Sequence, residues 1–186
     1  MQASPLKVVE LQKIHDTLRN SNSLWTSFFC GCVLLCTYAR ARWGDLKRSE
    51  KLIIDEDDDH VVSYVEVHVG RHKTMHAQQH KNASLGMVAP SLGIDRKPWA
   101  DRWLQLGKEL KIQSPPQHPI MPAPDQWGDV TDRPLESAQP GAWLRKVLFG
   151  CKSRLEDRRV STHSLKTTFL SYMLQNVAFL FLKDCS

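Results

Sequence analysis

The sequence has no hydrophobic run long enough to cross a membrane and no recognisable signal peptide. A membrane-spanning helix needs about 20 consecutive apolar residues, whereas the apolar run at residues 24–39 is shorter and includes Thr, Ser and Gly. Residues 1–22 are polar with a helical pattern, unlike the apolar centre of a signal peptide. We therefore expect a soluble, intracellular protein, nuclear in a eukaryote, with no membrane partner.

Cysteine is scarce, and its number is odd. Three of the five cysteines, Cys30, Cys32 and Cys36, lie within the apolar run. A disulfide framework would need an even set spread along the chain, so we interpret these residues as reduced thiols in the core.

Charge and composition fit one globular domain. The chain has 186 residues, of which 41% are hydrophobic and 24% charged, enough for a single core. The net charge of +5 is compatible with a polyanion but does not identify one. Basic residues concentrate in one segment: Arg145, Lys146, Lys152, Arg154, Arg158, Arg159 and Lys166. This cluster suits contacts to DNA phosphates, and a solvated helix face is the alternative.

The hydrophobic spacing predicts an α+β fold, mainly α, with a small antiparallel sheet. We expect two helices (from Ser4-Pro5 and from Ser23), a hairpin of strands at 60–69 and 85–90, a helix from Lys97, and two later helices. Residues 113–141 hold seven of the ten prolines and are predicted to form a long loop. No repeat or linker divides the chain, so we predict one domain over 1–186.

The apolar stripe of the second predicted helix leads to a charged residue. Its positions Trp25, Phe28, Cys32 and Leu35 step by three and four, and the stripe continues to Arg42. A charge at the end of an apolar face must reach solvent, pair, or meet an anion.

Four histidines recur at a spacing of four residues: His68, His72, His76 and His80. On a helix they would form a metal-binding face, but a predicted strand and Gly70 interrupt this segment. No cysteine or carboxylate follows at ligand spacing, so we assign no metal, and a His-rich metal-binding scaffold stays open as an alternative. Lys73, at the expected hairpin tip, is the other candidate in this segment.

Three segments, in this order, resemble the catalytic core of the tyrosine recombinases, which include phage integrases and related mobile-element enzymes. They are "ARARWGDL" (39–46), "HKT" (72–74) and "THSLKTTFLSYM" (162–173). In that family a helix ends in Arg-x-x-Glu/Asp before a strand, a lysine lies on a β-hairpin, and a later helix opens with His-x-x-Arg. The resemblance implies four catalytic residues and one supporting residue: Arg42, Lys73, His163 and Lys166, supported by Asp45.

The implied activity is DNA recombination or integration through breakage and rejoining of a phosphodiester. An arginine fork suits the phosphate oxygens, a lysine can protonate the leaving oxygen, and His163 would stand at a helix N-terminus that favours anions. The resemblance further implies DNA as the partner, possible self-association on DNA, no cofactor and no small-molecule substrate. Each residue also has a structural interpretation: a snorkelling Arg42, a capping His163, a solvated Lys166.

The sequence departs from the family at two points. Lys166 stands where the family has a second arginine, and this keeps the charge but loses the bidentate fork. No tyrosine fits the nucleophile's place, since Tyr172 shares a predicted helix with His163, Tyr38 lies in a helix and Tyr64 in a strand. Residues 176–186 form an apolar, atypical tail. We therefore expect a C-terminally truncated, partial catalytic domain that is inactive alone; a non-catalytic DNA-binding remnant is the alternative.

Overall fold

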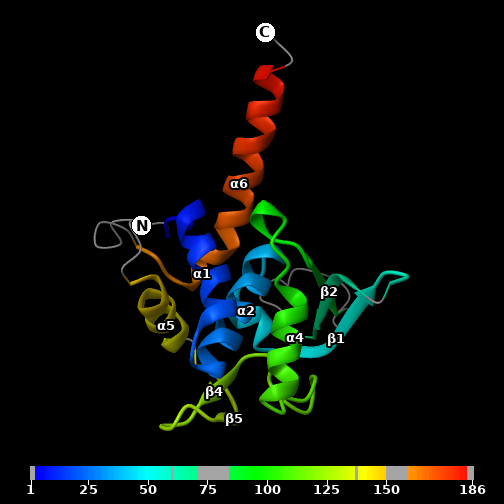
Figure 1. Cartoon of the computed structure of the whole chain (residues 1–186), viewed down its shortest axis with the longest axis vertical. Coiled ribbons are helices and arrows are strands. Elements are labelled where there is room, and N and C mark those ends of the chain that lie inside the picture. Colours follow the sequence, from blue (N-terminus) through cyan, green and yellow to red (C-terminus); the bar gives the residue numbers. More distant parts are fainter. Residues whose placement is uncertain (1–2, 60, 71–83, 137, 150–158, 184–186) are drawn as a thin grey trace.

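The fold is mainly helical, with two small antiparallel sheets (Figure 1). The computed structural model describes residues 3–59, 61–70, 84–136, 138–149 and 159–183, the last eleven by their backbone alone. The elements, in chain order, are α1 (Val8–Asn20), α2 (Leu24–Tyr38), α3 (Trp43–Leu46), β1 (Ser49–Glu56), β2 (Val62–Val69), β3 (Leu85–Pro90), the 3₁₀ helix η2 (Ile94–Arg96), α4 (Ala100–Glu109), β4 (Pro122–Pro124), β5 (Val130–Pro134), α5 (Gln139–Leu148) and α6 (Thr162–Lys183). The predicted α+β class, mainly α, is confirmed.

Helix α2 is the centre of the core. It contacts α1, α4, α6 and β3, and all of its residues except Leu24 and Thr26 are buried. The sequence predicted that one face of this helix is buried, whereas in the structure its neighbours cover it on every side. The thiols of Cys30, Cys32 and Cys36 are free and buried, as expected, and burial raises the pKa of each above its usual value.

Helix α2 ends at Tyr38, before it reaches Arg42. Arg40 takes a left-handed conformation (φ 54°), and the Ala41 N–H donates to the carbonyl of Cys36 (2.9 Å). This is the hydrogen-bond pattern that closes a helix C-terminus. The prediction that Arg42 continues the helical stripe was wrong, since the chain has already turned when it reaches that residue.

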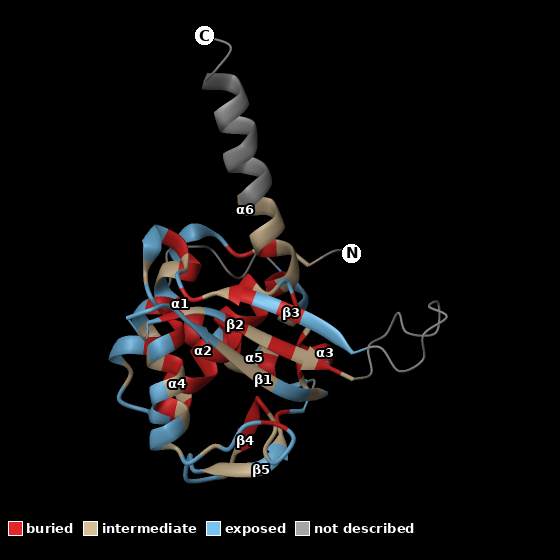
Figure 2. Ribbon diagram, turned by 90° about the vertical axis from the view of Figure 1, so that its right-hand side faces the viewer, coloured by how far each residue is buried: buried red, intermediate tan, exposed pale blue. Residues whose placement is uncertain are grey.

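The main sheet has the strand order β1-β2-β3, and all pairs are antiparallel. The predicted hairpin of β2 and β3 is confirmed, and its connection at 71–83 lies outside the described residues. Val65 and Val67 are buried and pair with the buried Ala89 and Met87. This face packs towards α2 and α4, and Figure 2 shows buried and less buried residues alternating along β2 and β3.

Strand β1 extends into the acidic run at 55–59. Asp55 and Glu56 end the strand, and only residues 57–59 form the exposed turn. Leu52 and Ile54 pair with the buried Val67 and Val65 of β2. These apolar cross-strand pairs stabilise β1, so the strand continues into the acidic residues that follow.

Helix α1 begins at Val8 rather than at Ser4. The Ser4 N–H donates to the carbonyl of Arg159 (3.2 Å), and the Leu6 N–H donates to Thr168 Oγ1 (2.8 Å). These backbone groups are held by the distant α6 region, so the capping signal at Ser4-Pro5 does not start a helix. The predicted loop at 113–141 likewise contains the β4–β5 pair and the start of α5.

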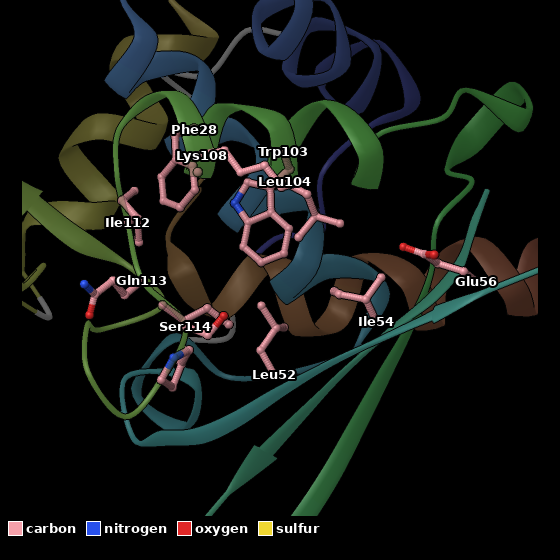
Figure 3. Close-up of a pocket in the computed structure, with 13 residues that line it drawn as sticks. Phe28, Leu52, Ile54, Glu56, Trp103, Leu104, Lys108, Ile112, Gln113 and Ser114 are labelled. Carbon is pink, nitrogen blue, oxygen red and sulfur yellow. The ribbon is translucent and has the colours of Figure 1, made fainter. Parts of the chain in front are cut away.

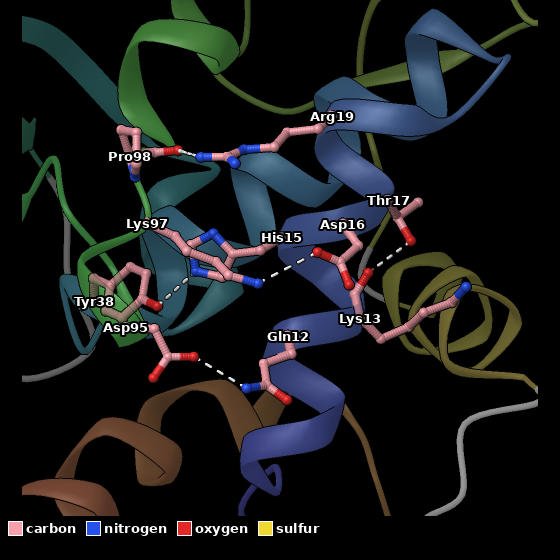
Figure 4. Close-up of polar contacts among 10 residues, drawn as sticks. All are labelled: Gln12, Lys13, His15, Asp16, Thr17, Arg19, Tyr38, Asp95, Lys97 and Pro98. Atoms are coloured by element: carbon pink, nitrogen blue, oxygen red, sulfur yellow. Dashed lines mark hydrogen bonds and ion pairs between the residues drawn. The ribbon is translucent and has the colours of Figure 1, made fainter.

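A buried polar pair lies between α1 and α2. His15 Nε2 is 2.9 Å from the hydroxyl of Tyr38, which also accepts the N–H of Ile94 (2.9 Å). Asp16 and Lys97 form an ion pair beside this pair (3.4 Å; Figure 4). The network fixes η2 against α1 and α2.

Within the described residues, no helix combines the length and the apolar character that crossing a membrane requires.

Candidate functional site

An open cleft of about 610 Å³ lies at the start of α6. Its lining consists of Ala3, Arg42, Arg159, Ser161, His163, Lys166 and Thr167. Three stretches far apart in the sequence thus meet here: the extended segment before α1, the turn between α2 and α3, and the start of α6.

Arg42 is positioned by the turn that follows α2. Its carbonyl accepts the N–H groups of Asp45 and Leu46 (3.0 and 3.2 Å), which makes it the residue that precedes α3. Trp43 and Leu46, the first and last residues of this short helix, are both buried and anchor it in the core. The side chain of Arg42 keeps 40% of its surface exposed and has Asp45 Oδ2 4.0 Å away. Asp45, the predicted supporting residue, is buried, and its supporting role stays a prediction.

The first turn of α6 has a buried and an open side. Ser164, Leu165 and Thr168 are buried, which leaves His163 and Lys166 on the side that lines the cleft. The His163 N–H donates to Ser161 Oγ (3.3 Å), and the Ser161 N–H donates to Ser164 Oγ (3.1 Å). These bonds satisfy backbone donors at the helix start in the manner of a capping box.

Arg159 is the third cation of the cleft. Its backbone carbonyl is bonded to Ser4, and the next residue, Val160, is buried. Arg145 Nη1 donates to the carbonyl of Val160 (3.5 Å). The backbone at Arg159 and directly after it is therefore held, while the side chain of Arg159 is exposed.

The lining is electropositive. It holds two guanidinium groups and one ammonium group together with His163, and its described members include no carboxylate. Because the backbone N–H groups at a helix start also favour negative charge, the cleft is suited to an oxyanion such as a phosphate.

The other predicted residues are not among the described lining of this cleft. Lys73, Lys152, Arg154 and Arg158 lie outside the described residues. Arg145 and Lys146 are exposed on α5 and do not belong to the described lining; the ammonium group of Lys146 lies 4.7 Å from the centre of the Trp143 ring.

Sequence reasoning missed part of the lining. Ser161, Ala3 and Thr167 were not singled out as site residues. The hydroxyl-rich run "STHS" at the helix start was the available signal for Ser161, whereas nothing local connects Ala3 to residues 159–167.

None of the three tyrosines is among the described residues that line the cleft. Tyr38 is buried with its hydroxyl engaged by His15 and Ile94, and burial raises the pKa of that hydroxyl above its usual range. Tyr64 lies on the outer face of β2. Tyr172 lies on α6 and lines a separate groove beside the segment before α1. That no tyrosine of this chain takes the nucleophile's place stays a prediction.

The described residues contain no group of three or more His, Cys, Asp or Glu that could hold a metal. Of the four regularly spaced histidines, only His68 is described; its Nε2 is 2.8 Å from Glu66 Oε1. His72, His76 and His80 lie outside the described residues.

A second cavity, of about 260 Å³, lies between β1 and α4 (Figure 3). Leu52 and Ile54 form one wall, and Trp103 and Leu104 form the other. The described lining of this mainly apolar cavity offers no cluster of cations comparable to that at the start of α6.

No family model matches the sequence, and no curated protein matches it either. The solved structures that are similar in fold include two complexes with Holliday junctions. The Flpe-Holliday junction complex matches with a TM-score of 0.50 and 13% identity over 91% of this chain. The FLP recombinase-Holliday junction complex I matches with a TM-score of 0.53 and 12% identity over 93% of this chain. The chain spans 42% of the length of each of these recombinase chains. At such identities the likeness extends to the fold: the chain folds like part of the FLP recombinase.

Proposed function

We propose that this chain binds a DNA phosphodiester in the cleft at the start of α6, as the phosphate-holding part of a tyrosine recombinase-like catalytic core. The observation that carries this proposal is the convergence of Arg42, Arg159 and Lys166, from separate parts of the sequence, around one helix start. The fold likeness adds support, because both similar structures are of recombinases with Holliday junctions.

The proposed roles follow from the chemistry of each group. Arg42 offers a planar fork that holds two non-bridging oxygens and remains charged. His163 stands beside the same phosphate position and can exchange a proton there. Lys166 adds a point charge. Lys73, on the connection between β2 and β3, is proposed as the acid for the leaving oxygen, as the resemblance implies.

We further propose that DNA recombination or integration, with a mobile-element origin, is the context of this core. A non-catalytic DNA-binding remnant is the alternative, and the positions of the tyrosines favour binding without cleavage by this chain. Self-association on DNA belongs to the same proposal.

Arg42→Ala is expected to weaken DNA binding about tenfold, since hydrogen bonds to charged groups contribute about 1.5–3 kcal/mol. The slope of log K against log salt should also fall by about one unit, as one phosphate contact is lost. Fluorescence anisotropy with a short labelled duplex over a series of salt concentrations measures both quantities.

The matched control is Arg133→Ala, which removes the same charge from an exposed position on β5. This variant should retain affinity within about twofold, apart from the small effect of net charge. Equal losses in the two variants would show that binding is unspecific attraction rather than contact in the cleft.

The chain should form no covalent complex with DNA. The measurement is a denaturing gel after incubation with a nicked DNA substrate that would trap an attached protein. The reason is that the described lining of the cleft offers no tyrosine to attack the phosphorus. A trapped complex that disappears in one of Tyr38→Phe, Tyr64→Phe or Tyr172→Phe would contradict this expectation and would identify the nucleophile.

A further inference from the structure

We infer that Arg159 is the second guanidinium that grips the phosphate in the cleft, and that Lys166 contributes only charge. The inference rests on the proposed function and deepens it by assigning the second bidentate contact to a residue seven positions before Lys166. Arg159 was expected from the sequence only as one of several general contacts to the DNA backbone.

The backbone around Arg159 is held in a way that suits a binding residue. The Ser4 N–H bonds to its carbonyl at 3.2 Å, and the side chain of Arg145 reaches the carbonyl of Val160. Val160 is 3% exposed, so it fastens the chain to the core directly after Arg159. A cation whose backbone is held loses less conformational freedom on binding than one on a free loop.

The side chain of Arg159 is available for a ligand within the described part of the chain. It lines the cleft together with Arg42, and no described carboxylate pairs with it, whereas Arg42 already has Asp45 at 4.0 Å. The two guanidinium groups come from separate parts of the sequence, the turn after α2 and the segment before α6. Two forks that line one cleft can together hold the two non-bridging oxygens of one phosphodiester.

The geometry of the donors separates the roles of Arg159 and Lys166. A guanidinium presents a rigid planar fork to two oxygens, whereas an ammonium group on a flexible stem acts as a point charge. Lys166 therefore supplies long-range attraction, and Arg159 supplies the oriented contact that the lysine cannot make.

The test compares the affinity of the full chain for a short labelled DNA duplex among matched variants. Arg159→Ala should lose about tenfold, and Arg159→Lys should lose about fivefold although it keeps the charge, because the fork is gone. Arg133→Lys, the same exchange at an exposed position on β5, should change the affinity by less than about twofold. The melting temperature of each variant should match that of the wild type, since Arg159 is exposed.

A second measurement reports on contact rather than on affinity. In a titration with inorganic phosphate, the Nε–Hε NMR signals of Arg42 and Arg159 should both shift, each signal being assigned by its disappearance in the corresponding lysine variant. An unshifted Arg159 signal beside a shifted Arg42 signal would overturn the inference.

The outcomes also separate this inference from the proposed function. If Arg42→Ala and Lys166→Ala weaken DNA binding while Arg159→Ala behaves like Arg133→Ala, the inference is wrong and the cleft keeps its proposed function. If none of the three cleft variants differs from Arg133→Ala, both are wrong.

Discussion

Gly31→Ala is expected to lower the free energy of unfolding by about 3 kcal/mol, because α2 and α4 touch at this glycine. A Cβ added to Gly31 would lie 2.6 Å from Cγ and 2.8 Å from Cβ of Trp103. The Cβ of Trp103 is fixed by the backbone of α4, so rotation of the side chain cannot remove this contact, and α4 itself has to shift. Alanine favours a helix over glycine by about 1 kcal/mol, and the clash outweighs that gain. Urea denaturation followed by circular dichroism measures the difference.

Gly44 provides the matched control, because a Cβ added there meets nothing within 4 Å. Gly44→Ala should leave the stability unchanged within about 0.5 kcal/mol or raise it slightly. In a Trp103→Gly background, which removes the Cβ as well as the indole ring, the loss caused by Gly31→Ala should largely disappear, since the two substitutions act through the same contact. A full loss in that background would show that Trp103 is not the obstacle.

The second expected result is an acid-dependent loss of stability that depends on His15. Burial, with further contributions from Lys97 and Arg19, lowers the pKa of His15 from 6.5 to about 4, and Asp16 and Asp95 oppose this shift. Below pH 6.5 the unfolded chain takes up a proton at this residue, whereas the folded chain stays neutral until about pH 4. The folded state should therefore lose roughly 3 kcal/mol relative to the unfolded state between about pH 7 and about pH 4.

The measurement is the free energy of unfolding at these two pH values in the wild type and in His15→Gln. Carboxylates titrate in both proteins, so the difference between the two pH-dependent losses isolates His15, and it should amount to roughly 3 kcal/mol. Tyr38→Phe is the control. It removes the hydroxyl that lies 2.9 Å from His15 Nε2 but keeps the imidazole buried, so it should lower stability at both pH values and retain most of the acid-dependent loss. Parallel curves for the wild type and His15→Gln would contradict the prediction.

Short-range patterns predicted the parts of the fold that depend on neighbouring residues. The β2–β3 hairpin follows from alternation within each strand, and α2 begins after Ser23 because the hydroxyl of this serine accepts the N–H of Thr26 (3.2 Å). The errors lie where distant contacts decide. The start of α1 depends on Arg159 and Thr168, and β1 depends on pairing with β2, and neither dependence is written in the local sequence.

The site shows the same division. Arg42, His163 and Lys166 could be singled out in the sequence because each belongs to a short ordered motif, and the structure places all three in one cleft. The place of Arg159 could not be predicted, since its segment holds seven basic residues that look alike in the sequence. What distinguishes Arg159 is tertiary structure: the Ser4 N–H donates to its carbonyl, and the next residue, Val160, is buried. The roles of all these side chains stay predictions for the experiments described above.

The bond from the Leu6 N–H to Thr168 Oγ1 spans 162 residues of sequence, and the bond from Ser4 to Arg159 is of similar reach. Closing so large a loop lowers the conformational entropy of the chain, and this cost is offset only when further contacts have formed. We therefore expect contacts of this range to form late in folding. The hairpin and the helices close over far shorter distances. We therefore expect the cleft at the start of α6 to be the part of the molecule completed last, after the helices and the sheet, so that the proposed binding of DNA would depend on the last contacts to form.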